Sequence, residues 1–271
     1  MTRTLTTAPP VHHRTTVVRG LTVAYREAGD PAAPTVVLLH GFPTSSHMFR
    51  GLIEDLAGSW HVIAPDHVGF GASDTPPIDT FDYTFDQLTA TTTELLDRLG
   101  ADRFALYIQD YGAPIGLRIA SRHPHRVTGL IVQNGNAYEE GLTPFWDDLR
   151  AFWADRDAHE AAVRELLQTD DFRWQYTHGV PADRRDRISP DTWRLDRAGV
   201  DRPGNVEVQL QLFWDYRTTL DAYPHFQAYL RDVPKAELHL LDAGHFALET
   251  HRGEIAALTD AFLHRVLPRA A

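Results

Sequence analysis

Three short segments, each placed after an apolar run, contain residue types suited to covalent catalysis. The first is His40-Gly41-Phe42-Pro43, where the glycine allows a sharp turn that points the next N–H into a pocket. The second contains Asp110, a carboxylate that is ionised at neutral pH and needs no base before it attacks. The third contains His245, whose side-chain type is the most frequent general base in enzymes.

Asp110 lies where an apolar strand is expected to turn into a helix. The segment Ala105–Gln109 is apolar up to its last residue, and the small residues of Gly112–Gly116 begin the helix. This is the shape of a nucleophile elbow, with Asp in the position that Ser usually takes. Ile108 stands where that motif has Gly, which is a departure from it. Taken alone, Asp110 fits equally well as the N-cap of the helix.

His245 follows the expected last strand, Glu237–Leu241, and the turn Asp242-Ala243-Gly244. A histidine after the last strand and downstream of the nucleophile matches the chain order of hydrolases that have a nucleophile elbow. The three segments together favour catalysis over a separate structural explanation for each.

Other catalytic motifs are absent from the sequence. It contains no G-x-S-x-G and no H-E-x-x-H, and Gly69-Phe70-Gly71 is followed by Asp74 where a dinucleotide fingerprint has its third glycine. The chain has no cysteine, which excludes disulfides, thiolate metal sites and a cysteine nucleophile. We therefore expect neither a metal nor a cofactor.

The elements that would position these segments alternate between strand and helix. Thr35–His40 is a continuous apolar run, typical of a strand buried on both faces of a parallel sheet. Alternation of this kind indicates βαβ units and an α/β fold with a mostly parallel sheet. After a loose tail at residues 1–15 we expect strands at TTVVRG, LTVAYREA, 35–40, 61–64, 104–108, 130–132 and 237–241, and helices at 46–57, 83–99, 113–122 and 251–266.

The rhythm changes between residues 137 and 231, which are helix-like and charged throughout. Five of the six tryptophans lie here. We interpret this segment as a helical cap inserted between two parts of the core, 1–136 and 232–271. Its aromatic residues either form a small core of the cap or line a ligand pocket, and both can hold.

Composition limits the partners. The formal net charge of −11 argues against nucleic acid and anionic membranes, which need basic patches. No apolar run has the roughly 18 residues of a membrane span, and the polar N-terminal segment lacks the apolar core of a signal peptide. We expect a cytoplasmic protein that acts on a small molecule.

The segments HGFP (40–43), DHVGFGASD (66–74), YIQDYGAPIG (107–116) and DAGHFALE (242–249) resemble the epoxide hydrolase and haloalkane dehalogenase branch of the α/β-hydrolases. The resemblance implies that Asp110 attacks an sp3 carbon of a small apolar substrate and forms an alkyl ester. It also implies that the N–H groups of Phe42 and Tyr111 form an oxyanion hole, and that His245 activates the water that hydrolyses the ester.

The substrate class depends on other residues of the resemblance. Dehalogenases of this branch usually have Trp after the nucleophile, and this chain has Tyr111. Epoxide hydrolases use cap tyrosines to protonate the opening ring, and Trp214-Asp215-Tyr216-Arg217 resembles the segment that carries one of them. Tyr176 is the second candidate, while Tyr216 fits equally well as an ordinary buried aromatic residue. These features favour an epoxide over a halide.

One part of the family pattern is missing. Between Tyr216 and Glu237 the sequence has no apolar run of strand length and no acid after it, so one late core strand and the acid that orients His245 are absent. The alternating stretch Val206–Leu212 is either a replacement strand or, as in the family, a helix. Asn134 stands at the alternative acid position of some dehalogenases and has no charge. Asp215 and Asp221 have no spacing argument, so the acid stays unassigned.

Two functional hypotheses follow from the missing acid. An enzyme would complete the first step and hydrolyse its ester slowly or not at all, because His245 lacks the partner that stabilises its charged form. The alternative is an inactive or ligand-binding protein with the same fold. The missing strand would also expose apolar sheet surface, so lower stability or self-association into a homo-oligomer is expected.

Overall fold

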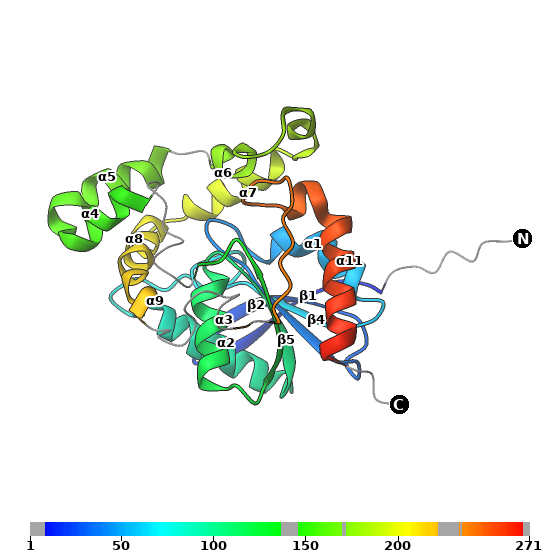
Figure 1. Ribbon diagram of the computed structural model, residues 1–271. Helices are drawn as coiled ribbons and strands as arrows, with labels where there is room; N and C mark the ends of the chain where they lie inside the picture. Colours follow the sequence, from blue (N-terminus) through cyan, green and yellow to red (C-terminus); the bar gives the residue numbers. More distant parts are fainter. Residues whose placement is uncertain (1–8, 137–145, 170–171, 222–232, 234, 268–271) are drawn as a thin grey trace, which may run out of the picture.

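The structure is a computed structural model that describes residues 9–136, 146–169, 172–221, 233 and 235–267. Its centre is a twisted sheet with helices on both faces, and a further set of helices lies beyond one end of the strands (Figure 1). None of the described helices is both long and apolar enough to span a membrane.

Six strands form the sheet in the order β1-β2-β4-β3-β5-β6. The pairs β1–β2 and β2–β4 are antiparallel, and β4–β3, β3–β5 and β5–β6 are parallel, as expected for a mostly parallel α/β fold. The expected tail is shorter than residues 1–15, because the first strand already begins at His12. The strands are β1 His12–Val18, β2 Leu21–Ala28, β3 Thr35–Leu39, β4 His61–Pro65, β5 Phe104–Gln109 and β6 Val127–Gln133.

Successive strand residues point to opposite faces and pack under different helices. Val37, Leu39 and Ile108 belong to the hydrophobic cluster beneath α2 (Phe85–Arg98) and α3 (Gly112–Arg122). Val36, Leu38 and Tyr107 belong to the opposite cluster, which includes α1 (Arg50–Leu56) and α11 (Leu248–Val266). A short 3-10 turn, η1 (Ser46–Phe49), leads into α1. Full burial on both faces explains why β3, β4 and β5 are apolar without alternation.

The middle of the chain is helical, as expected for a cap. The stretch Val206–Leu212 lies within helix α8, so the alternative of a replacement strand is wrong. The predicted boundaries at 137 and 231 lie outside the described residues. The described helices of this part are α4 Asp147–Ala154, α5 Arg156–Thr169, α6 Arg173–Thr177, η4 Ala182–Arg187, α7 Asp191–Val200, α8 Asn205–Asp215 and α9 Arg217–Asp221.

The predicted last strand, Glu237–Leu241, is wrong: these residues form no strand, and Leu238 and Leu240 are 63% and 87% exposed. A strand needs a neighbour for its N–H and C=O groups, and within the described part of the chain the sheet ends at β6. Every residue of β6 is only partly buried, whereas every residue of β5 is buried. Among the described residues no strand lies beyond β6, so both β6 and residues 237–241 lack the cover that an interior position provides.

Candidate active site

The turn between β5 and α3 has the backbone geometry expected of a nucleophile elbow. Asp110 has φ 48°, in the left-handed region that non-glycine residues rarely adopt. Helix α3 takes Tyr111 as its N-cap residue and has no side-chain cap, so the alternative in which Asp110 caps the helix is wrong. A side chain at Gly112 would lie 2.1 Å from the carbonyl oxygen of Leu39, so only glycine allows the helix to begin this close to β3.

Two backbone N–H groups hold one oxygen of the Asp110 carboxylate. Asp110 Oδ1 accepts hydrogen bonds from the N–H of Phe42 at 2.7 Å and from the N–H of Tyr111 at 2.6 Å. These are the two donors that the sequence analysis assigned to an oxyanion hole, and they converge on one atom. Such donors stabilise negative charge that develops on that atom during a reaction.

Strand pairing brings the two donors and the carboxylate together. β3 and β5 are parallel neighbours in which Leu39 pairs with Ile108, so the segments that follow them leave the sheet side by side. A Cβ atom at position 41 would lie 2.3 Å from Asp110 Oδ1. Gly41 is therefore required for the close approach of this loop to the nucleophile.

His245 lies on the other side of the carboxylate. Its Nε2 atom is 3.6 Å from Asp110 Oδ2, the oxygen that the N–H groups leave free, and the two side chains keep 30% and 23% of their surface exposed. Burial lowers the pKa of His245, and the charge of Asp110 partly offsets this effect. Burial likewise raises the pKa of Asp110, against the opposing effects of His245 and the two N–H donors. The geometry places a neutral imidazole beside a carboxylate.

Gln109 is a site residue that the sequence analysis did not identify. Its side chain is fully buried, and its Nε2 atom lies 2.9 Å from Nε2 of His245. An amide nitrogen can only donate, so in this arrangement the imidazole accepts at Nε2 and carries its proton on Nδ1. Its position next to the nucleophile was the only signal in the sequence.

The positions considered for the orienting acid do not pair with the imidazole. Asn134 donates from Nδ2 to the backbone oxygen of His245 at 2.7 Å, so it anchors the loop rather than the ring. Asp215 accepts the N–H of Phe85 and so holds the start of α2. The side chain of Asp221 lies outside the described residues. Among the residues that the structure describes, none hydrogen bonds to Nδ1 of His245.

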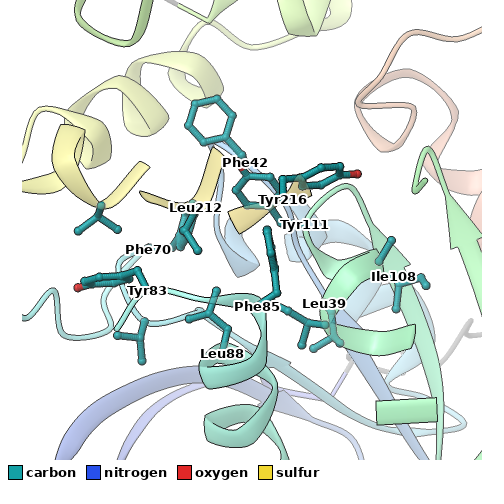
Figure 2. Packing of buried hydrophobic residues seen from close by; sticks show 14 of the residues in the cluster. Leu39, Phe42, Phe70, Tyr83, Phe85, Leu88, Ile108, Tyr111, Leu212 and Tyr216 are labelled. Atoms are coloured by element: carbon teal, nitrogen blue, oxygen red, sulfur yellow. The ribbon is translucent and has the colours of Figure 1, made fainter. Parts of the chain in front are cut away.

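Aromatic side chains from the cap cover the nucleophile elbow. Tyr216 is 3% exposed, and its ring centroid is 5.8 Å from that of Tyr111 (Figure 2). Trp146 and Trp153 stack on Tyr216, and Phe213 packs against Phe42 with centroids 5.1 Å apart. The hydroxyl of Tyr111 is buried and has no hydrogen-bond partner within the described part of the chain. Cap and core therefore share one aromatic cluster beside Asp110.

Tyr176, the second cap candidate, is engaged elsewhere. Its hydroxyl donates to Asp196 Oδ2 at 2.5 Å, and its ring stacks on Phe246, the neighbour of His245, at 4.1 Å. Burial raises the pKa of Asp196 to about 7, against the hydrogen bond from Tyr176. This pair ties α6 and α7 of the cap to the loop that carries the base.

Two cavities among the described residues lie away from Asp110. One of about 250 Å³ lies among α1, η4 and the start of α11. The other, of about 710 Å³, lies on the cap surface among arginines of α6, η4 and α7. We place the reactive site at Asp110 because strain, N–H donors and the base converge there, and neither cavity is lined by Asp110 or His245.

Comparisons with known proteins agree with this fold. A family model described as α/β hydrolase fold matches residues 34–234, and the chain belongs to the α/β hydrolase family. An uncharacterized hydrolase of Saccharomyces cerevisiae is 41% identical over 276 residues, covering 90% of this chain and 94% of that protein. Haloalkane dehalogenase 1 of Mycobacterium tuberculosis is 43% identical over 103 residues, which cover 38% of this chain and 34% of the dehalogenase.

Solved structures with this fold include both chemical classes. Epoxide hydrolase CorEH has a TM-score of 0.74 at 20% identity, covering 94% of this chain and 99% of that one. The haloalkane dehalogenase DatA of Agrobacterium tumefaciens has a TM-score of 0.72 at 23% identity, covering 94% and 97%. At these identities the likeness establishes the fold, which supports the α/β-hydrolase expectation and does not select a substrate.

The yeast relative also contains residues that this chain lacks. The match has 276 aligned positions but covers only 90% of 271 residues, which leaves roughly 30 positions without a counterpart here. A strand with its connection and helix needs about that many residues. The number of unmatched positions is thus close to the size of one strand–helix unit.

Proposed function

We propose that this protein is a hydrolase that acts through an ester on Asp110 and that its substrates are epoxides. The observation that carries the proposal is the split environment of the carboxylate. Oδ1 is held by two N–H groups, while Oδ2 is free of backbone donors and faces His245. A carboxylate bound in this way has one oxygen available for attack and one oxygen positioned for the later intermediate.

In the first step, Asp110 Oδ2 attacks a ring carbon of the epoxide. The ring C–O bond breaks, its electron pair stays on oxygen, and this oxygen takes a proton from a tyrosine hydroxyl that solvent later restores. Tyr216 is the better placed of the two cap candidates, since its ring packs beside Tyr111, the neighbour of Asp110, while the ring of Tyr176 stacks on Phe246. The product of the step is a hydroxyalkyl ester.

In the second step, water attacks the carbonyl carbon of the ester and gives its proton to His245. The negative charge develops on Oδ1, where the N–H groups of Phe42 and Tyr111 stabilise it. Collapse of the intermediate expels the diol oxygen, which takes the proton from His245. The second water proton, left on the Asp110 carboxyl group, returns through solvent to the tyrosine, and this step restores the carboxylate. A haloalkane would follow the same path with halide as the leaving group.

The proposal is tested by trapping the ester. The variant His245→Gln lacks the base, so an ester formed from styrene oxide should accumulate and add the mass of one intact epoxide to the protein after denaturation. A gain of alkyl without halogen from a bromoalkane panel would identify a dehalogenase instead. A folded sample that gains no mass from any substrate would contradict the covalent mechanism and favour the ligand-binding alternative.

A further inference from the structure

The two halves of the site are unequally equipped for the two steps. The groups needed to form the ester are present: the strained elbow, two N–H donors on Oδ1 and an Oδ2 atom that faces His245. The groups needed to hydrolyse it depend on His245, and three features of its surroundings oppose that role.

The first feature is the unsupported side of the imidazole. Within the described residues, Nδ1 of His245 has no hydrogen-bond partner. The nearby Asn134 donates to the backbone oxygen of His245 and not to its ring. A base that takes a proton becomes an imidazolium, and a carboxylate at Nδ1 normally stabilises that ion. No described residue supplies this stabilisation to the imidazolium of His245.

The second feature is the amide of Gln109. Its N–H points at Nε2 of His245 from 2.9 Å, and Nε2 is the atom that faces Asp110. Nε2 has one lone pair, so a water that is to be deprotonated there must displace the amide. Within the described residues, the contact with His245 is the one hydrogen bond that the Gln109 side chain makes, because its Oε1 atom is buried without a partner.

The third feature appears only after the ester has formed. The charge of Asp110 is the single effect that raises the pKa of His245, while burial lowers it. Esterification removes that charge. In an enzyme with a separate acid, the acid would keep the histidine basic at this point; here the histidine becomes a weaker base in the state that needs it.

We propose that this chain captures one epoxide per molecule as a long-lived ester on Asp110, with Gln109 and the unsupported imidazole holding back its hydrolysis. This inference rests on the proposed function, since it requires the ester to form. Loss of the orienting acid lowers the rate of a serine-protease triad by about 10⁴, and typical enzymes turn over about 10 times per second. The expected lifetime of the ester is therefore on the order of ten minutes or longer.

The test uses the unmodified chain with styrene oxide, whose ring suits an aromatic site. Protein mass and free diol are followed from seconds to hours, and the free epoxide is removed by desalting once the adduct has formed. We expect close to one adduct per chain, located at Asp110 by peptide mapping, released by hydroxylamine, and persisting for minutes or more. Many equivalents of diol per chain without a stable adduct would overturn capture and leave the proposed function intact. A folded protein that gives neither adduct nor diol would contradict the proposed function itself.

Two variants separate the causes. In His245→Gln the lifetime of the ester should lengthen less than tenfold, because the histidine contributes little; a lengthening by several orders of magnitude would show an active base and overturn the inference. In Gln109→Leu the competing donor is gone, and hydrolysis should accelerate by up to about tenfold, the worth of one hydrogen bond. An unchanged or longer lifetime would show that Gln109 does not obstruct the base.

Discussion

The two sides of the site differ in how firmly the sheet holds them: the nucleophile side around Asp110 and the base side around His245. On the nucleophile side, Phe42, Asp110 and Tyr111 follow two fully buried parallel strands, and each makes a short hydrogen bond to another. On the base side, His245 follows a segment that forms no strand and is fixed through Asn134 at the end of the partly buried β6. The difference follows from the sheet, because the turn at Asp110 depends on β3, β5 and α3, whereas residues 237–241 have no neighbouring strand within the described part of the chain.

The largest expected effect is on the nucleophile side. Asp110→Asn should abolish adduct formation with styrene oxide, because an amide is not a nucleophile at this carbon. The same variant should raise the Tm above pH 7. Burial raises the pKa of Asp110, so the ionised carboxylate destabilises the fold above that pKa, and Asn carries no charge.

Intact mass and thermal unfolding measure both effects. The control is Asp102→Asn, an exposed carboxylate just before β5. An adduct that still forms on Asp110→Asn would mean that another residue is the reactive group, and it would contradict the assignment of the nucleophile side to Asp110.

The next effect concerns the proton given to the opening ring. Tyr216→Phe should slow adduct formation by about 10² or more, the usual contribution of a general acid, while the aromatic packing is preserved. The rate is measured from the growth of the adduct mass at fixed epoxide concentration. Tyr176→Phe is the matched variant, and a larger loss there than at Tyr216 would move the acid role to Tyr176.

A smaller effect is expected where the base loop meets β6. Asn134→Ala removes the donor to the backbone oxygen of His245 and should lower the free energy of unfolding by about 1 kcal/mol. The ester should also persist longer, while its formation slows less, since Asn134 touches only the base loop. Urea unfolding and adduct decay provide the two measurements. Equal slowing of both steps would mean that the two sides are not independent.

The smallest effect is a change in pH dependence. The pKa of Asp196 is raised to about 7, above the ordinary value of 3.8, so the folded protein binds a proton more tightly than the unfolded chain. The contribution of that proton to the free energy of unfolding should be largest below about pH 4 and should decrease as the pH rises to 7. Asp196→Asn should flatten this slope and still accept the hydroxyl of Tyr176. Unfolding free energies between pH 4 and 8 measure it, with the exposed Asp191→Asn as control; an unaltered slope would assign the pH dependence to other groups.

Most of the nucleophile side could be predicted from the sequence. Apolar runs located β3, β4 and β5, and the small residues after Asp110 indicated the elbow, since a turn this tight admits few residue types. The base side was harder to predict. Glu237–Leu241 has the composition of a strand but no neighbour, and composition carries no information about whether a partner strand exists.

The sequence by itself determined the α/β architecture and the tight turn at Asp110, because these follow from local patterns of apolar, small and turn residues. Only the tertiary structure decided that Gln109 donates to His245, that Asn134 anchors the base loop and that Tyr176 pairs with Asp196. Each of these contacts joins residues from separate elements, at least 20 positions apart in the chain. Their distance and direction are set by how the strands and the cap pack together, which no local pattern specifies.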